Sequence, residues 1–532
     1  MNTYIQLDVI PFHNDFTSCF EECMISVANY YRRGYILMYS QAWGFSFETV
    51  NYKINGIGNS IKDDRGRVYD LFDFYHGIRL SFTDNGDPFE VMNIIISGLL
   101  NNNPIGVHMD TFYYSWDPNK NQHGKHWFLI TGVDTAKKVF YCTDPYFLQK
   151  DSVLDFEDFI KGYLGVFFSF KINKPETPDY DWKQFVYKIA EKFEGKNRGR
   201  CIFENMSDFA DIVEDEFSTE NERASYSRVV DMPYYTNLQS VSRGRLQYAS
   251  FLEHTAARYN VNDLPFLSEK LRQASYKWDV LRGIITKGIL ASNESIIKAK
   301  IPPKIREIAS AEADVLNLLI DAASGTSPHK YSVPETSKNT PNSFEKVNFA
   351  DYSYIDLSDY FNNKAFGALL NENSKADFNG AGLFLVEEDF CRNDFWLVND
   401  MRFKFPRTET SQNDNVTCSG QLLEFPPVKC GIIMLLGTAD FGSFKDSILV
   451  HFTSGTTEEI TVGFTELIFD PQYGETTARE GRACERLNGT VQIHNSRVKI
   501  FAKTYSFSNP GDVARISLPY LPNIHIFAIT LA

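Results

Sequence analysis

The sequence contains no long apolar run and few cysteines. No stretch of apolar residues reaches the length that a membrane-spanning helix needs, which is about 20 residues. Eight cysteines are scattered over 532 residues without regular spacing, so a disulfide framework is excluded. Residues 1–8 show no basic segment followed by an apolar core, and we expect no secretory signal. These absences predict a cytoplasmic protein without a membrane partner, in a reducing compartment that preserves free thiols.

Positive charge is also in short supply. The chain has 53 Lys and Arg against 68 Asp and Glu, which gives a formal net charge of -15. A basic surface supplies most of the affinity for nucleic acids, so this balance argues against a nucleic-acid partner but leaves small cationic substrates open. Neither a phosphate-binding glycine loop nor a dinucleotide fingerprint occurs. We therefore expect no cofactor of the protein's own.

Apolar and aromatic side chains are abundant. Hydrophobic residues make up 43% of the chain and aromatic residues 15%, with 44 Phe and 28 Tyr. This composition indicates well-packed globular parts rich in strands, and the length predicts two to four domains.

The stretch Ser18-Cys19-Phe20-Glu21 places a thiol at the start of a helix. Ser18 and Glu21 have the spacing of a capping box. The apolar residues that follow at helical spacing are Phe20, Cys23, Met24, Val27, Tyr30 and Tyr31. Cys19 is then in the first helical turn, where free backbone N–H groups and the helix dipole favour the thiolate. The sequence thus predicts a cysteine nucleophile.

Two downstream segments supply the partners that such a thiol needs. Residues 124–133 indicate a loop that enters a buried strand, with His126 at the strand's mouth. Residues 139–145 indicate the next strand, with Asp144 at its end before a proline. On adjacent strands His126 and Asp144 can meet while Cys19 approaches from the helix. We interpret the three residues as nucleophile, general base and orienting carboxylate.

Each residue also has an interpretation without catalysis. A cysteine on an apolar helix face is usually a core residue, as we expect of Cys23, and Asp144 before a proline can simply initiate a turn. Asp110, at the end of another apolar run, is a second candidate for orienting the histidine or for shaping the pocket.

The oxyanion of an acyl-transfer intermediate needs donors near the thiol. The backbone N–H of Cys19 is one candidate, and His13 or Asn14 from the preceding loop is the other, unless these two only fix the turn. His108 and His123 accompany His126, but no helical His-x-x-x-His pair or Cys-x-x-Cys pair is present. We therefore expect no metal site.

The order Cys, His, Asp on these elements resembles the papain-like fold and bacteriocin-processing peptidases of that fold. More narrowly, residues 1–172 resemble the N-terminal domain of the butirosin biosynthesis protein H family, acyltransferases that move an acyl group from a carrier-protein thioester to an amine. The resemblance rests on Cys19, residues 43–47, residues 104–110, His126 and Asp144-Pro145. The residues around Cys19 do not follow the family's pattern, so the resemblance assigns no oxyanion donor.

A helical bundle is predicted over residues 173–323, after a polar boundary. Apolar residues recur at helical spacing in five segments: Trp182–Phe193, Phe209–Phe217, Leu246–Tyr259, Leu264–Ile285 and Ile305–Ala323. Its basic residues are candidates for contacting an acidic carrier protein, or they form an ordinary solvated face. They are Arg243, Arg245, Lys298, Lys300, Lys304 and Arg306.

The last part of the chain is predicted to form a linker followed by a β-sandwich. Residues 324–349 are rich in Ser, Thr, Pro and Asn, and residues 350–532 alternate short apolar strands with turns, as in a jelly roll. Residues 356–363, 376–380 and 420–421 resemble galactose-binding-like modules, which implies carbohydrate as a ligand or mere packing against neighbours. Trp396, Phe403, Tyr473 and Tyr505 form either a stacking platform or core.

Together these features predict a multidomain α+β protein with a papain-like cysteine domain, a helical bundle and a C-terminal jelly-roll β-sandwich. The function that we expect is a cysteine-dependent acyltransferase of secondary metabolism. It would take an acyl or peptidyl group from the phosphopantetheine arm of a carrier protein, through acyl-Cys19, to a small-molecule amine. A cysteine peptidase or amidase, a cyclase of carrier-bound chains and a noncatalytic binding protein are the alternatives.

Overall fold

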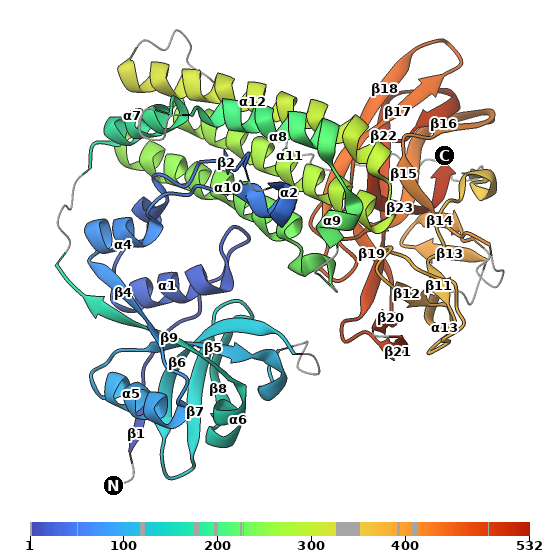
Figure 1. Cartoon of the computed structure of the whole chain (residues 1–532). Coiled ribbons are helices and arrows are strands. Elements are labelled where there is room, and N and C mark those ends of the chain that lie inside the picture. Colours follow the sequence, from blue (N-terminus) through green and yellow to red (C-terminus); the bar gives the residue numbers. More distant parts are fainter. Residues whose placement is uncertain are drawn as a thin grey trace.

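The computed structural model describes residues 3–50, 52–117, 123–174, 180–195, 200–223, 226, 228–325, 352–390, 394–406, 412–487 and 489–532. An N-terminal α+β part, a helical bundle and a β-sandwich follow one another along the chain (Figure 1). Of the predicted linker, Ser324 and Gly325 form the end and the cap of the last bundle helix. Residues 326–349 lie outside the described residues.

The N-terminal part is built on a seven-stranded antiparallel sheet. Its strand order is β4-β9-β5-β6-β7-β8, and β1 pairs with β6. The strands are β1 (Tyr4–Gln6), β4 (Ile78–Asp84), β5 (Ile105–Asp110), β6 (Lys125–Asp134), β7 (Val139–Asp144), β8 (Gln149–Asp155) and β9 (Tyr163–Ile172). The central strand β6 is buried along nearly all of its length, as the apolar run in its sequence indicates.

Helix α1 (Cys19–Tyr30) packs on β6 and lies between the sheet and the bundle (Figure 1). It begins with the predicted capping box: Glu21 N donates to Ser18 Oγ (3.3 Å), and Ser18 N donates to Glu21 Oε2 (2.9 Å). The other helices of this part are α2 (Tyr52–Asn55), α3 (Ile57–Ser60), α4 (Val68–His76), α5 (Pro88–Leu100) and α6 (Phe156–Gly162), with short turns η1 (Ile36–Tyr39) and η2 (Thr111–Tyr113) and the small ribbon β2 (Ser46–Phe47) and β3 (Ile61–Lys62).

The bundle contains all five predicted helices, most of them longer than expected. They are α7 (Trp182–Phe193), α8 (Ile202–Glu216), α10 (Pro233–Tyr259), α11 (Leu264–Leu290) and α12 (Glu294–Ser324), with short α9 (Thr219–Arg223) and η3 (Val229–Asp231) between them. Helix α12 continues through Pro302 and Pro303, which is why its first turns carry no clear sequence signal.

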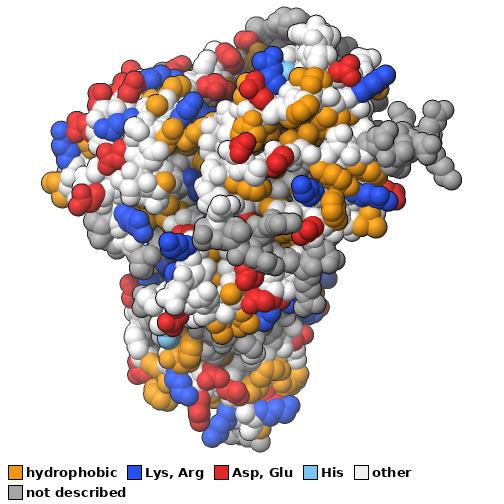
Figure 2. All heavy atoms as spheres, turned by 90° about the vertical axis from the view of Figure 1, so that its right-hand side faces the viewer, with side chains coloured by type: hydrophobic (Ala, Val, Ile, Leu, Met, Phe, Trp, Pro, Cys, Tyr) orange, Lys and Arg blue, Asp and Glu red, His pale blue; other side chains and the backbone are white. Residues whose placement is uncertain are grey.

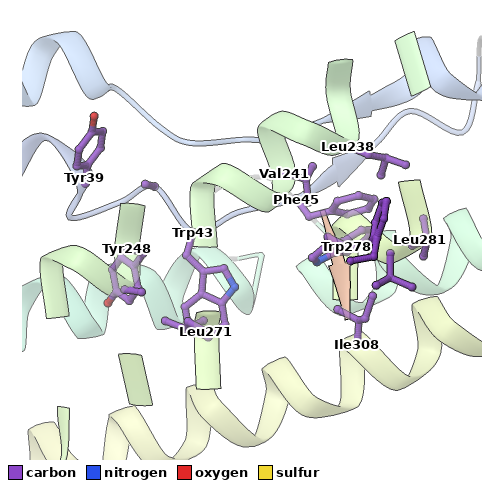
Figure 3. Packing of buried hydrophobic residues seen from close by; sticks show 14 of the residues in the cluster. Tyr39, Trp43, Phe45, Leu238, Val241, Tyr248, Leu271, Trp278, Leu281 and Ile308 are labelled. Atoms are coloured by element: carbon purple, nitrogen blue, oxygen red, sulfur yellow. The ribbon is translucent and has the colours of Figure 1, made fainter. Parts of the chain in front are cut away.

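The bundle core encloses part of the N-terminal segment. Trp43 and Phe45, which lie between η1 and β2, are fully buried, and Phe45 stacks on Trp278 of α11 at 5.4 Å between ring centroids (Figure 3). The buried carboxylate of Glu312 in α12 accepts from Trp43 Nε1 (2.8 Å), Trp278 Nε1 (2.9 Å) and both Nε and Nη2 of Arg245 in α10 (2.9 Å each). One carboxylate thus joins the N-terminal segment to three helices.

The C-terminal part is a β-sandwich, as predicted. Its larger sheet has the order β10-β23-β16-β22-β17-β18, with β15 paired to β23 and β19 to β22, and a four-stranded sheet has the order β11-β12-β20-β21. The strands of these sheets are β10 (Ser353–Tyr354), β11 (Phe366–Gly367), β12 (Leu383–Val386), β15 (Val416–Ser419), β16 (Leu422–Ala439), β17 (Phe444–Phe452), β18 (Thr457–Phe464), β19 (Thr476–Gly481), β20 (Ala483–Leu487), β21 (Thr490–Ile493), β22 (Val498–Ser517) and β23 (Tyr520–Leu531). The hairpin β13 (Phe395–Val398) and β14 (Met401–Lys404), the turn η4 (Ser358–Tyr360) and helix α13 (Glu387–Phe390) complete it. Trp396 and Phe403 are buried, so they belong to the core rather than to an open stacking platform.

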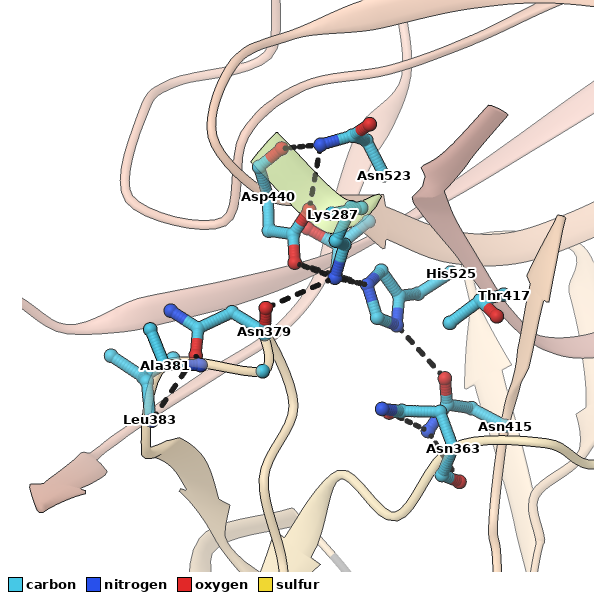
Figure 4. Close-up of polar contacts among 12 residues, drawn as sticks. Lys287, Asn363, Asn379, Ala381, Leu383, Asn415, Thr417, Asp440, Asn523 and His525 are labelled. Atoms are coloured by element: carbon cyan, nitrogen blue, oxygen red, sulfur yellow. Dashed lines mark hydrogen bonds and ion pairs between the residues drawn. The ribbon is translucent and has the colours of Figure 1, made fainter. Parts of the chain in front are cut away.

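The sandwich is joined to the bundle by buried polar groups (Figure 4). Lys287 of α11 forms an ion pair with Asp440, donates to the Asn379 carbonyl (3.3 Å) and has its Nζ 3.4 Å from His525 Nε2. On the other side of the His525 ring, Nδ1 is 2.9 Å from Asn415 Oδ1. Because burial lowers the pKa of His525 to about 4, this ring is neutral at physiological pH and fits beside the Lys287 charge.

On the face seen in Figure 2, Lys and Arg side chains are interspersed with Asp and Glu and form no continuous basic surface. Among the helices that the structure describes, none has both the length and the apolar character to cross a membrane.

Replacing the buried carboxylate at the centre of the bundle tests its structural role. We expect Glu312→Gln to lower the free energy of unfolding by about 3–5 kcal/mol, because it leaves the Arg245 charge uncompensated and places an amide donor against other donors. Chemical denaturation measures this change. The control is Glu307→Gln on the same helix, which removes only an exposed pair with Lys277 and should cost at most about 1 kcal/mol. Equal losses in the two variants would contradict the proposed role.

Candidate active site

The structure brings Cys19, His126 and Asp144 together. His126 Nε2 lies 3.0 Å from both carboxylate oxygens of Asp144, and both side chains are buried. Leu129 of β6 pairs with Thr143 of β7, so His126 and Asp144 are diagonal neighbours at the ends of adjacent strands. A carboxylate only accepts, and Nε2 therefore carries the proton in this contact.

Cys19 occupies the first turn of α1, half-buried, and lies close enough to His126 for its thiol to act on the pKa of that ring. Since Nε2 faces Asp144, the nitrogen left for the thiol is Nδ1. Burial lowers the pKa of His126, but the hydrogen bonds and charges of Asp144 and Cys19 outweigh it and raise the pKa to about 10. The ring is therefore held as an imidazolium at neutral pH.

Asp144 is held in turn by a residue that the sequence analysis missed. Trp116 Nε1 donates to Asp144 Oδ2 (2.9 Å), and the Trp116 ring packs against Tyr114 at 4.6 Å between centroids. This donor fixes the carboxylate plane toward His126. The sequence offers no local signal for it, because Trp116 follows β5 by a turn whose path only the fold defines.

The loop before α1 is organised by a buried carboxylate, Glu22. Its Oε1 lies 2.7 Å from His13 Nδ1 and accepts from Thr17 Oγ1 (3.1 Å) and from the backbone N of Asn14 (3.5 Å). Burial raises the pKa of Glu22 to about 7, although His13 and these hydrogen bonds oppose the shift. One candidate oxyanion donor, His13, is thus already engaged through Nδ1.

Asn14, the other candidate, has a free donor. Its Oδ1 accepts from Phe16 N (3.1 Å) and Thr17 Oγ1 (2.9 Å), which fixes the orientation of the amide. Its Nδ2 is buried and has no hydrogen-bond partner among the residues that the structure describes. Buried amide donors are rarely left unpaired, so this donor is available to bind a substrate oxygen. The unpaired donor makes Asn14 a better candidate than His13 for the oxyanion donor that accompanies the backbone N–H of Cys19.

Asp110 has other partners than the proposed base. Its carboxylate lies 2.7 Å from His123 Nδ1 and accepts from the backbone N of Phe112 and Gly124 (3.2 Å each). The orienting contact to His126 comes from Asp144 instead. His108, also on β5, stacks on Trp127 at 4.4 Å.

Helix α1 is braced by the bundle. Glu21 Oε1 accepts from Arg65 Nη1 (2.9 Å) and from Gln247 Nε2 of α10 (3.1 Å), and Gln247 also donates to the Phe16 carbonyl (3.1 Å). Both ends of the turn that presents Cys19 are therefore tied to α10. The neighbouring Arg245 is fully buried on Glu312, so the interpretation of this residue as a surface contact for a carrier protein is wrong.

The comparisons with known proteins concern the C-terminal part. A family model described as AziU2-like beta-sandwich domain matches residues 351–532. No curated protein sequence matches the chain. The match agrees with the sandwich seen in the structure and does not extend to Cys19, His126 or Asp144.

Removing the charge of Asp144 tests the electrostatics of the site. We expect the pKa of His126 to fall from about 10 toward or below its ordinary 6.5 in Asp144→Asn, because burial then dominates. The charged ring stabilises the wild-type fold in full below about pH 6.5, and this contribution is lost as the pH rises through about 10. Titration of 13C-labelled histidine by NMR measures the shift, with His126→Gln for assignment. An unchanged pKa would contradict the described geometry.

The free amide of Asn14 gives a second test. Asn14→Asp keeps the oxygen that holds the loop but removes the donor, so we expect acylation of Cys19 by p-nitrophenyl acetate to slow by about 100-fold or more relative to its alkylation by iodoacetamide. Alkylation forms no oxyanion and reports on the thiol alone. His13→Ala is the matched variant, with an expected effect below about tenfold. A larger effect of His13→Ala would reverse the assignment.

Proposed function

We propose that this protein is a cysteine-dependent acyltransferase. The observation that carries the proposal is the convergence of Cys19, His126 and Asp144, from a helix start and two adjacent strand ends, with the thiol half-exposed. The same order of residues underlies the resemblance to the papain-like fold and, more narrowly, to the butirosin biosynthesis protein H family.

In the first half of the reaction, Cys19 Sγ attacks the carbonyl carbon of an acyl or peptidyl thioester on the phosphopantetheine arm of a carrier protein. The thiol proton already resides on the His126 imidazolium, so Cys19 attacks as the thiolate, and the oxyanion is bound by the Cys19 backbone N–H and Asn14 Nδ2. Collapse of the intermediate breaks the bond to the arm's sulfur, which leaves as a thiol with the proton from His126. Acyl-Cys19 remains.

In the second half, a small-molecule amine attacks the carbonyl carbon of acyl-Cys19. His126, neutral after the first half, accepts a proton from the amine, and the Cys19 sulfur departs as a thiolate beside the imidazolium, so the enzyme ends in its starting state. Asp144 holds the imidazole throughout. Exchange of one thioester for another is nearly balanced in energy, so the contribution of the protein is position and the exclusion of water.

A cysteine peptidase or amidase would use the same three residues, with water as the acceptor. A cyclase would use an amine or hydroxyl of the bound chain itself. The three reactions differ only in the nucleophile that attacks acyl-Cys19. The resemblance of residues 1–172 to the acyltransferase family favours transfer. For the sandwich, the two alternatives are binding of a carbohydrate ligand and a purely structural role.

Intact-mass analysis tests the proposal. The protein is incubated with a panel of acylated carrier proteins, and we expect a mass increase that corresponds to the acyl group in the wild type and disappears in Cys19→Ala. The matched control is Cys201→Ala, because Cys201 is likewise half-buried at the start of a helix and should be dispensable. A cleaved peptide without any adduct would point to a peptidase, and the absence of both would favour a noncatalytic binding protein.

A further inference from the structure

The environment of Cys19 extends beyond the N-terminal part. Tyr146, in the loop after β7, lies 5.7 Å from His126 between ring centroids. Burial raises the pKa of Tyr146, Arg243 of α10 lowers it, and the charges of Cys19 and of Glu466 from the sandwich raise it further. The bundle and the sandwich therefore each supply a charged side chain that acts on the ring beside His126.

Arg282 of α11 is a buried arginine with unused donors. It is 6% exposed, its Nη2 lies 3.2 Å from Asp279 Oδ1, and its guanidinium lies over the Tyr235 ring at 4.4 Å. Its Nε and Nη1 have no hydrogen-bond partner among the described residues. Buried guanidinium groups are normally fully bonded, so these two donors point to a group that the protein itself does not supply.

Arg243 lies on the neighbouring helix, α10, next to Ser242, whose Oγ donates to Asp279 Oδ2 (2.8 Å), the partner of Arg282. The Arg243 side chain is half-buried, and within the described part of the chain it forms no hydrogen bond or ion pair. The charges of Arg282, Glu466, Asp279 and Arg243 all act on Tyr235, so both arginines lie within electrostatic range of this ring. Burial and Asp440 raise the pKa of Glu466 to about 7 against the effect of Arg282, so Glu466 adds only a partial negative charge to that of Asp279, the partner of Arg282.

We propose that Arg243 and Arg282 bind an anionic oxygen group of the substrate, a phosphate or a carboxylate, beside Cys19. Planar guanidinium donors match the paired oxygens of such groups, and Nε and Nη1 of Arg282 are unpaired donors that such oxygens would satisfy. The inference rests on the proposed function, because it treats Cys19 as the reacting atom. Two sources carry the required group: the phosphate of the carrier's arm and a carboxylate on the acyl chain or acceptor.

Alkylation of Cys19 tests the charge preference without knowledge of the substrate. Iodoacetate and iodoacetamide are of similar size and differ in charge, so the ratio of their rates reports on the anion site. We expect Arg243→Gln and Arg282→Gln each to lower this ratio at least about threefold, because each removes a local positive charge. Arg272→Gln, on the exposed side of α11 and paired with Glu253, should keep the wild-type ratio. A wild-type ratio in Arg243→Gln would overturn the proposal.

Binding to Cys19→Ala identifies the source of the anion and does not depend on thiol chemistry. Calorimetry compares 4′-phosphopantetheine with pantetheine, and N-acetylglycine with N-acetylglycinamide. Tighter binding of the phosphorylated arm, lost in Arg243→Gln, assigns the site to the carrier's phosphate, whereas preference for the carboxylate in the second pair assigns it to the acyl chain or acceptor. No preference in either pair overturns the anion site. A thiol that iodoacetamide cannot alkylate, together with a preserved preference, would instead overturn the proposed function alone.

Discussion

The buried carboxylate of Glu312 determines where helix α10 lies, and the environment of the thiol depends on α10. A buried ion pair is stable only when its remaining hydrogen-bonding capacity is satisfied. Here two indole donors and both sides of the Arg245 guanidinium saturate the two oxygens. Arg245 Nη1 also donates to the Gly44 carbonyl (2.5 Å), which fixes the N-terminal segment along the same helix. The network therefore specifies a position more than it adds stability.

The opposite face of α10 faces the segment that contains Cys19. Gln247 and Arg243 are four residues apart and share a face, while Arg245 points the other way into the core. Gln247 bonds the first turn of α1 at Glu21 and the Phe16 carbonyl. Two acidic side chains in that first turn would oppose a thiolate, but Glu21 is neutralised by Arg65 and burial raises the pKa of Glu22 to about 7. The helix start thus retains its preference for negative charge at Cys19.

The local features of the site could be predicted from the sequence, because they depend on residues close together in the chain. The capping box at Ser18 and Glu21 and the strand ends at His126 and Asp144 are of this kind. The contacts that hold the site were not predictable, since they join residues far apart: Trp43 and Glu312 are 269 positions apart, and Gln247 and Phe16 are 231. An arginine is usually exposed, so nothing in the sequence marked Arg245 as buried.

The position of the sandwich follows from the same kind of buried contact. Helix α11 approaches it so closely that a Cβ at Gly283 would lie 2.8 Å from Asn523 Oδ1, and the Lys287 pair with Asp440 lies beyond. Both contacts are largely buried, and they hold the sandwich against α11. Glu466 then stands at a defined place relative to α10, and α10 at a defined place relative to Cys19. A hydrolase needs only water at its acyl-enzyme, whereas a transferase needs its acceptor held in one orientation. Charged side chains of the bundle and the sandwich act on Tyr146, the ring beside His126, and fixed positions of this kind are compatible with the second requirement.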